Sequence, residues 1–301
     1  MPNKLHFSQK HPFCFGFLLI TAAVILLVGV MAALRFWAFG DSGRNPLLRS
    51  PGRKLGLVRI EGIIANPERI TRWISDLRED SSVLGVLLRI NSPGGAVAPS
   101  QEIYRSVKRL ADVKPVVASM GAVAASGGYY AAAPAHTIMA NPATITASIG
   151  VIMELSNIQG LFEKLGLKQE SLTSGKLKDA GSPFRPMTPE ERKYLQGLVM
   201  DLHRQFVADV AAARNMDLSE VQALADGRAM TGQQALEAGL VDKLGGLEEA
   251  VDLLKSMCGV KGKIAVVEGP ETKTSLLWEL LGMFDLNPGS RNPGPLWRFQ
   301  Y

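Results

Sequence analysis

The chain alternates between segments with the apolar pattern of buried strands and segments with the spacing of amphipathic helices. Strands are predicted at residues 55–64, 83–90, 116–120, 137–140 and 150–153. The run at 83–90 is almost unbroken in apolar side chains, as expected for a strand that is buried on both faces. Helices are predicted at residues 68–79 and 102–110. This alternation predicts an α/β fold with a mainly parallel sheet covered by helices.

A long helix is predicted to begin after Thr188. The sequence Thr188-Pro-Glu-Glu191 places threonine at the N-cap, proline at the first helical position and glutamate at N3, which is the pattern of a capping box. Apolar residues then recur at helical spacing and predict a stripe that faces the core: Leu195, Leu198, Val199, Leu202, Phe206 and Val210. His203 lies beside this stripe, which favours a structural role over a catalytic one.

Residues 13–34 form an apolar segment without a charged side chain. About 20 such residues span a hydrocarbon core of roughly 30 Å, so the segment predicts one transmembrane helix after a short tail at 1–12. A cleaved signal peptide is the alternative, but its apolar region normally covers only about 7 to 15 residues. Residues 35–53 are rich in Gly, Pro, Ser and Arg and predict a linker from the membrane to the folded domain.

One catalytic domain is predicted at residues 54–260, followed by a C-terminal extension at 261–301. The extension contains a predicted strand at 263–268 and a predicted short amphipathic helix at 275–284. Its last part, from residue 287, is rich in Pro and Gly and is predicted to be disordered.

The 301-residue chain carries a net charge of +5 and has a pI of about 9.2. Its basic residues form no stripe with interleaved aromatic side chains, so a nucleic-acid partner is not predicted. Basic residues between the apolar segment and the domain fit attraction to anionic membrane lipid. The two cysteines, Cys14 and Cys258, lie in different parts of the chain and are not expected to pair. No metal cluster or nucleotide-binding loop is visible, so no cofactor is predicted.

Ser126 lies in a run of small residues, Met120-Gly-Ala-Val-Ala-Ala-Ser-Gly-Gly-Tyr-Tyr130, that follows a predicted strand. Upstream, Asn91-Ser-Pro-Gly-Gly95 ends another strand. A serine that attacks a carbonyl carbon needs two N–H groups aimed at the oxyanion that forms, and glycines permit such close approach. None of the four histidines is convincingly placed to activate this serine. The base must then be another residue, for which Lys178 is a candidate and Lys176 its competitor.

With these residues, the chain resembles the short form of the signal peptide peptidase A family, which are membrane-anchored serine-lysine proteases. The likeness covers about residues 55–256. Five motifs carry it in one order: Asn91-Ser-Pro-Gly-Gly95, Ala125-Ser-Gly-Gly128, Thr146-Ala-Ser-Ile-Gly-Val151, Lys178-Asp-Ala-Gly-Ser-Pro183, and Asp226-Gly-Arg228 with Gly239-Leu-Val-Asp242. The resemblance implies a Clp protease/crotonase-like fold of repeated β-β-α units with a mainly parallel sheet, plus one N-terminal transmembrane helix.

The resemblance also implies a role for each of five residues: Ser126 as nucleophile, Lys178 as general base, the N–H groups of Gly95 and Gly127 as oxyanion hole, and Ser148 as the hydrogen-bonding partner that orients the lysine amine. A free lysine amine titrates at about 10.4 and must lose its proton before it can act as a base. We therefore expect a buried amine with the neighbouring Asp179 carboxylate pointing away from it.

The activity implied by the resemblance is that of a membrane-bound endopeptidase that degrades cleaved signal peptides and other apolar peptides. It implies a homo-oligomeric ring in which the serine of one protomer works with the lysine of the next. It also implies the bacterial inner membrane, with the domain on the periplasmic side, whereas a count of basic residues around the apolar segment predicts a cytoplasmic domain. Two alternatives are a crotonase-like enzyme acting on a CoA thioester and a non-catalytic membrane scaffold.

Overall fold

The computed structural model describes residues 52–270 and 297–300, together with residues 13, 21–22, 25–26 and 29–30, which are helical. The chain divides into two units, Met1–Arg49 and Ser50–Tyr301. Most of the predicted transmembrane segment, and all of the predicted helix at 275–284, lie outside the described residues. Among the helices that are described, none combines the length and the apolar character that crossing a membrane requires.

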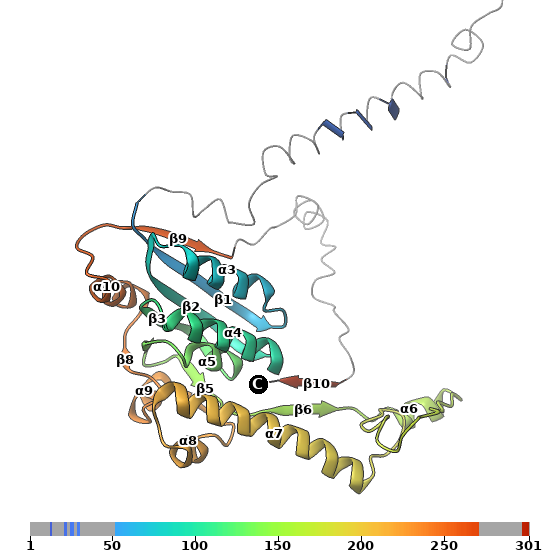
Figure 1. Ribbon diagram of the computed structural model, residues 1–301. Helices are drawn as coiled ribbons and strands as arrows, with labels where there is room; N and C mark the ends of the chain where they lie inside the picture. The colour runs from blue at the N-terminus through green and yellow to red at the C-terminus, as the bar shows by residue number, and fades with distance from the viewer. Residues whose placement is uncertain are drawn as a thin grey trace, which may run out of the picture. The chain divides into compact units, whose positions relative to one another are not determined.

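An eight-stranded sheet forms the centre of the second unit, in the order β7-β5-β3-β2-β1-β9, with β4 paired to β3 and β8 (Figure 1). Its strands are β1 (Lys54–Ile64), β2 (Val83–Gly95), β3 (Val116–Ala125), β4 (Thr137–Ala140), β5 (Ile145–Ala147), β7 (Ala229–Thr231), β8 (Lys243–Leu244) and β9 (Ala265–Gly269). All pairs in this sheet are parallel except β5 with β7. The predicted α/β fold with a mainly parallel sheet is confirmed.

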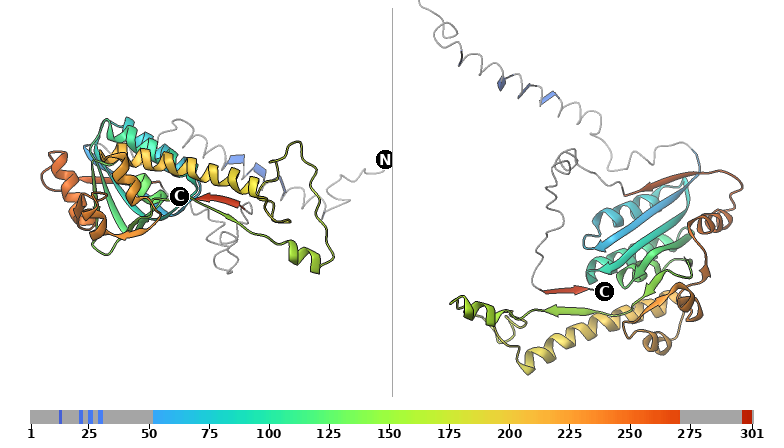
Figure 2. Two further views of the ribbon diagram at one scale, coloured as in Figure 1. Left: turned by 90° about the horizontal axis from the view of Figure 1, so that it is seen from below. Right: turned by 180° about the vertical axis from the view of Figure 1, so that it is seen from behind.

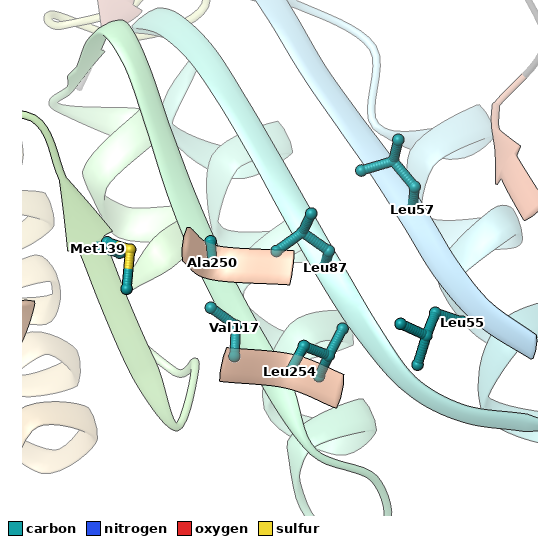
Figure 3. Packing of buried hydrophobic residues seen from close by; sticks show 7 residues of the cluster. All are labelled: Leu55, Leu57, Leu87, Val117, Met139, Ala250 and Leu254. Carbon is teal, nitrogen blue, oxygen red and sulfur yellow. The ribbon is translucent and has the colours of Figure 1, made fainter. Parts of the chain in front are cut away.

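Helices cover both faces of the sheet, which explains its apolar runs. On one face, Ala250 and Leu254 of α10 (Leu247–Met257) lie beside Leu87 and Val117, in a buried cluster that also includes Leu55 and Leu57 (Figure 3). On the other face lie α3 (Glu68–Glu79), α4 (Val97–Ala111) and α5 (Gly127–Ala132). Because successive side chains of a strand point to opposite faces, Gly56 faces α3, where an added Cβ would lie 2.9 Å from the Leu77 methyl groups.

A long segment between residues 152 and 200 carries almost no core, and we call it the arm. It contains β6 (Ile152–Leu155), α6 (Gln159–Lys164) and the first half of α7 (Pro189–Arg214). Glu191 is the only buried residue in the arm. Two views show β6 and the first half of α7 both extending away from the sheet (Figure 2).

Helix α7 starts as predicted, but its apolar stripe does not face a core along its whole length. The capping box of Thr188 and Glu191 is present. Phe206 and Val210 are fully buried, whereas Leu198 in the arm is 38% exposed. The predicted core stripe is therefore wrong for the first half of the helix, because that half lies in the arm and not against the sheet.

The remaining elements are α8 (Leu218–Leu224), α9 (Gly232–Glu237) and the C-terminal strand β10 (Trp297–Gln300). Strand β10 pairs antiparallel with β6, with Trp297 opposite Leu155 and Gln300 opposite Ile152. These four residues form a strand where the sequence predicts disorder, because β6 offers them an edge with unpaired backbone groups.

Candidate active site

Ser126 lies at the sharp turn between β3 and α5. Its φ and ψ angles are 55° and −118°, a region that a residue with a side chain seldom adopts. The turn is held at both ends: the Ser126 N–H donates to the Ala147 carbonyl at 2.7 Å, and the Ser126 carbonyl accepts from the Tyr130 N–H at 2.9 Å. The residue is 6% exposed. The predicted nucleophile thus occupies a strained turn that its surroundings keep in one conformation.

The two glycine segments predicted to form the oxyanion hole are in contact. A Cβ on Gly127 would lie 2.3 Å from Ser100 Oγ and 3.3 Å from the Cα of Gly94. Gly95 ends β2 opposite Ile64 of β1, and a Cβ there would lie 2.2 Å from the Ile64 carbonyl oxygen. A side chain at Gly95 would therefore displace the backbone of β1, and one at Gly127 would displace the Ser100 side chain. The fold therefore brings the end of β2 against the turn that carries the serine.

Ser148 reaches the same place from the neighbouring strand. The register of β3 and β5 matches Ala125 with Ala147, so Ser126 and Ser148 each follow directly after the last matched pair. Thr146 strengthens this pairing because its hydroxyl donates to the Ala124 carbonyl at 2.7 Å. Strand β5 is only three residues long and is absent from the strands predicted from the sequence.

The Ser148 hydroxyl is engaged within its own chain. Its Oγ donates to the Gly227 carbonyl at 3.1 Å, and its N–H donates to the Arg228 carbonyl at 3.0 Å. Ser148 has a φ of 53°, so two neighbouring strand ends both leave the sheet through left-handed turns. The predicted lysine-orienting residue is thus next to the predicted nucleophile.

Lys178 is not part of this cluster within one chain. It lies in a turn of the arm, where its N–H donates to the Gly175 carbonyl at 3.0 Å, and its side chain is exposed. Across residues 52–270, nothing forms a hydrogen bond or ion pair with its amine. The expectation of a buried lysine is wrong for the single chain, because the arm has no core in which to bury it.

The neighbours of Lys178 are tied to other partners. Lys176 forms an ion pair with Glu190, 2.5 Å from Nζ to Oε2. Asp179 accepts from Arg185, 2.8 Å from Oδ1 to Nη2, so its carboxylate is directed to that guanidinium, as the base hypothesis requires. Arg185 is not among the residues predicted for the site, because nothing in its spacing distinguishes it from an exposed arginine.

The histidines of the described region lie outside the cluster. His136 accepts from the Val116 N–H through Nδ1 at 3.1 Å, which fixes the start of two strands. His203 is half-buried on α7, and this burial lowers its pKa below the ordinary value. His6 and His11 lie outside the described residues. Within the described residues, no group of three or more His, Cys, Asp and Glu side chains could hold a metal ion.

The chain is similar to several known peptidases. Peptidase family S49 matches residues 108–261, a segment that contains both Ser126 and Lys178. A protein of Synechocystis described as a protease is 42% identical over 231 residues, which cover 75% of this chain and 83% of the relative. A protein of Enterococcus faecium described as signal peptide peptidase SppA is 43% identical over 191 residues, 63% of this chain and 56% of the relative. The chloroplastic serine protease SPPA of Arabidopsis thaliana is 33% identical over 257 residues, 81% of this chain and 38% of the plant protein.

Proposed function

Because this chain belongs to peptidase family S49 and is a serine-type peptidase, we propose that Ser126 is its nucleophile and Lys178 its general base. One observation carries the assignment of the serine. Ser126 is held in a strained turn at 6% exposure, beside the glycine segment that ends β2. Strained, over-determined backbone of this kind clusters at catalytic sites.

The proposed reaction uses only groups of this protein and water. The neutral amine of Lys178 takes the proton of the Ser126 hydroxyl while Oγ bonds to the peptide carbonyl carbon. The N–H groups of Gly95 and Gly127 receive the oxyanion. The protonated amine then gives its proton to the leaving nitrogen, the C–N bond breaks, and water hydrolyses the acyl-enzyme by the same steps in reverse order.

The site is completed, in this proposal, between two protomers of a homo-oligomeric ring. The arm supports this, because its apolar side chains are exposed in the single chain: Ile152, Leu161, Leu165, Leu167, Leu172, Tyr194, Leu198 and Met200. An exposed apolar surface of this extent is typical of an interaction site. No described residue pairs with the amine of Lys178, and contact between protomers would remove it from water and favour its neutral form.

Extended apolar peptides, including cleaved signal peptides, are the proposed substrates. The edge of β6 supports this, because it begins four residues after Ser148 and already accepts the chain's own residues 297–300 as an antiparallel strand. A substrate that pairs in the same way would be held by its backbone, with little dependence on its sequence.

We further propose that residues 13–34 anchor the protein as a single-pass protein of the bacterial inner membrane, in contact with its lipid and with the domain on the periplasmic side. Phe13, Ile25 and Leu26 are helical and expose 92%, 67% and 70% of their surface, which suits a lipid surrounding. Protease added to spheroplasts should degrade the domain. A domain that stays intact until the membrane is permeabilised would contradict the orientation.

Labelling with a fluorophosphonate probe tests the reaction class. The wild-type chain should be labelled at Ser126, and Ser126→Ala and Lys178→Ala should each lose labelling and peptide hydrolysis. Lys176→Ala is the matched control and should keep both, since that amine is paired with Glu190. Hydrolysis that survives Ser126→Ala would refute the serine mechanism. An unlabelled serine together with turnover of a CoA thioester would favour the crotonase-like alternative.

A further inference from the structure

Arg185 joins the turn that carries Lys178 to the beginning of α7. Its guanidinium donates to the Asp179 carboxylate, with Nη2 2.8 Å from Oδ1 and Nε 3.3 Å from Oδ2. It also donates to Glu191, with Nη1 3.0 Å from Oε2. Two carboxylates therefore share one planar cation, a geometry that suits the guanidinium fork and that a lysine ammonium cannot reproduce.

The Glu191 end of this bridge is fixed. Glu191 is 3% exposed, its Oε2 accepts from the Thr188 N–H at 2.9 Å, and its own N–H donates to Thr188 Oγ1 at 3.2 Å. The hydrogen bond from Arg185, and then those from Thr188, hold the pKa of Glu191 at about 2. A charged, buried carboxylate at the start of a long helix thus anchors the arginine.

Besides this bridge, the turn is tied to α7 by the ion pair of Lys176 with Glu190, and the Lys178 N–H donates to the Gly175 carbonyl within the turn. Downstream, the Ile158 N–H donates to the Pro183 carbonyl at 2.7 Å, and the rings of Phe162 and Phe184 meet edge to face at 4.7 Å. These contacts hold residues 183 and 184. The bridge from Arg185 acts on Asp179, the residue directly after Lys178.

We propose that Arg185 is a positioning residue for the Lys178 amine, because it holds the turn against α7 and keeps the Asp179 carboxylate occupied. This inference rests on the proposed function, in which Lys178 is the base. A carboxylate without a partner next to the amine would favour the protonated, inactive ammonium. Pairing with the guanidinium removes most of that influence.

The other charged groups around the turn are already balanced. Lys176, on the same turn, is paired with Glu190 of α7. Glu191, the other carboxylate of that helical turn, is paired with Arg185. Loss of Arg185 would therefore release two carboxylates beside the turn, of which Asp179 is adjacent to the amine in the chain.

The pH dependence of kcat/KM in the full-length assembled protein tests this role. In Arg185→Ala, the acid limb of the profile should move to higher pH by about one unit, so that activity at a pH well down this limb falls about ten-fold. Adding Asp179→Asn to Arg185→Ala should move the limb back towards that of the wild type. If Arg185 only stabilised the arm, its loss could lower the rate. The acid limb would then not move back when Asp179→Asn removes the neighbouring charge.

Three further variants keep the test decisive if Arg185→Ala does not fold. Arg185→Lys retains a cation against the buried Glu191 but cannot serve both carboxylates, so its limb should also move to higher pH. Asp179→Asn alone should leave the acid limb within about half a pH unit of its wild-type position, because Arg185 already compensates the Asp179 carboxylate. Thr188→Ala weakens the helix cap and should leave the limb in place.

The outcomes separate this inference from the proposed function. Full activity in Lys178→Ala would overturn the assignment of the base, and the inference with it. An inactive Lys178→Ala together with an unchanged limb in both Arg185 variants would overturn only the role of Arg185. The role of Arg185 would also be overturned if adding Asp179→Asn to Arg185→Ala fails to move the acid limb back. It would equally be overturned if Asp179→Asn alone moves the acid limb by a full pH unit.

Discussion

The backbone N–H of Ser126 donates a hydrogen bond to the carbonyl oxygen of Ala147 across 2.7 Å, where β3 and β5 end side by side. Both residues have positive φ angles, 55° and 58°. Each such conformation costs about 1–3 kcal/mol in a residue with a side chain. The bond joins the two turns, so the strands and their register maintain a backbone shape that neither segment would adopt alone.

Relief of this strain should be measurable in two variants of Ser126, both of which the proposed mechanism expects to be inactive. Ser126→Gly should unfold with a free energy about 1 kcal/mol higher than Ser126→Ala, because glycine adopts the observed angles freely and this gain exceeds its extra entropy in the unfolded chain. Urea denaturation of both variants measures the difference. A Ser126→Ala protein that is the more stable of the two would show that the turn carries no strain.

Gly95, at the end of β2, packs closely against the backbone of Ile64, so substitution of this glycine should be costly. Gly95→Ala should lower the free energy of unfolding by about 3 kcal/mol and abolish labelling of Ser126, since its Cβ would lie 2.2 Å from the Ile64 carbonyl oxygen. Gly160→Ala in α6 is the matched control, because nothing lies within 4 Å of its Cβ position. Equal losses in the two variants would contradict the packing argument.

The core elements could be predicted from the sequence because burial on both faces leaves a strong pattern. Strand β1 and helix α3 lie within a residue of their predicted bounds. Strand β5 could not be found in this way, because three residues show no periodicity and its position depends on pairing with β3. In the sequence, this segment is singled out only by the family motif that contains Ser148.

The arm marks the limit of sequence reasoning at this site. A helical apolar stripe has the same spacing whether it faces its own core or another chain, so the exposure of Leu198 could not be foreseen. The ion pairs of Arg185 depend on the path of the loop and leave no spacing to recognise. Lys178 is exposed because the arm has almost no core. The local composition around Lys178 does not reveal that.

Removal of the last five residues, 297–301, should raise the activity towards short peptides. Residues 297–300 occupy the edge of β6, and a substrate that uses this edge must displace them. The kcat/KM of the truncated protein should therefore exceed that of the full chain, mainly through a lower KM. A truncated protein with unchanged kinetics would show that substrates do not use this edge.

Glu191 should contribute stability that acid removes. The hydrogen bond from Arg185 and those of the helix cap lower its pKa to about 2, whereas an unfolded glutamate titrates at about 4.3. Its contribution is present above the unfolded value and is lost as the pH falls from about 5 to 2. Glu191→Gln should therefore be less stable at pH 7 and lose less stability across this window. Parallel curves for the two proteins between pH 5 and 2 would contradict the assignment.

Complementation between two inactive chains tests the central claim most directly. Ser126→Ala and Lys178→Ala proteins are mixed, dissociated, reassembled and assayed for peptide hydrolysis. If the serine of one protomer works with the lysine of its neighbour, activity should return in the mixed assembly while each variant alone stays inactive. Mixed assemblies that form and remain inactive would contradict a shared site.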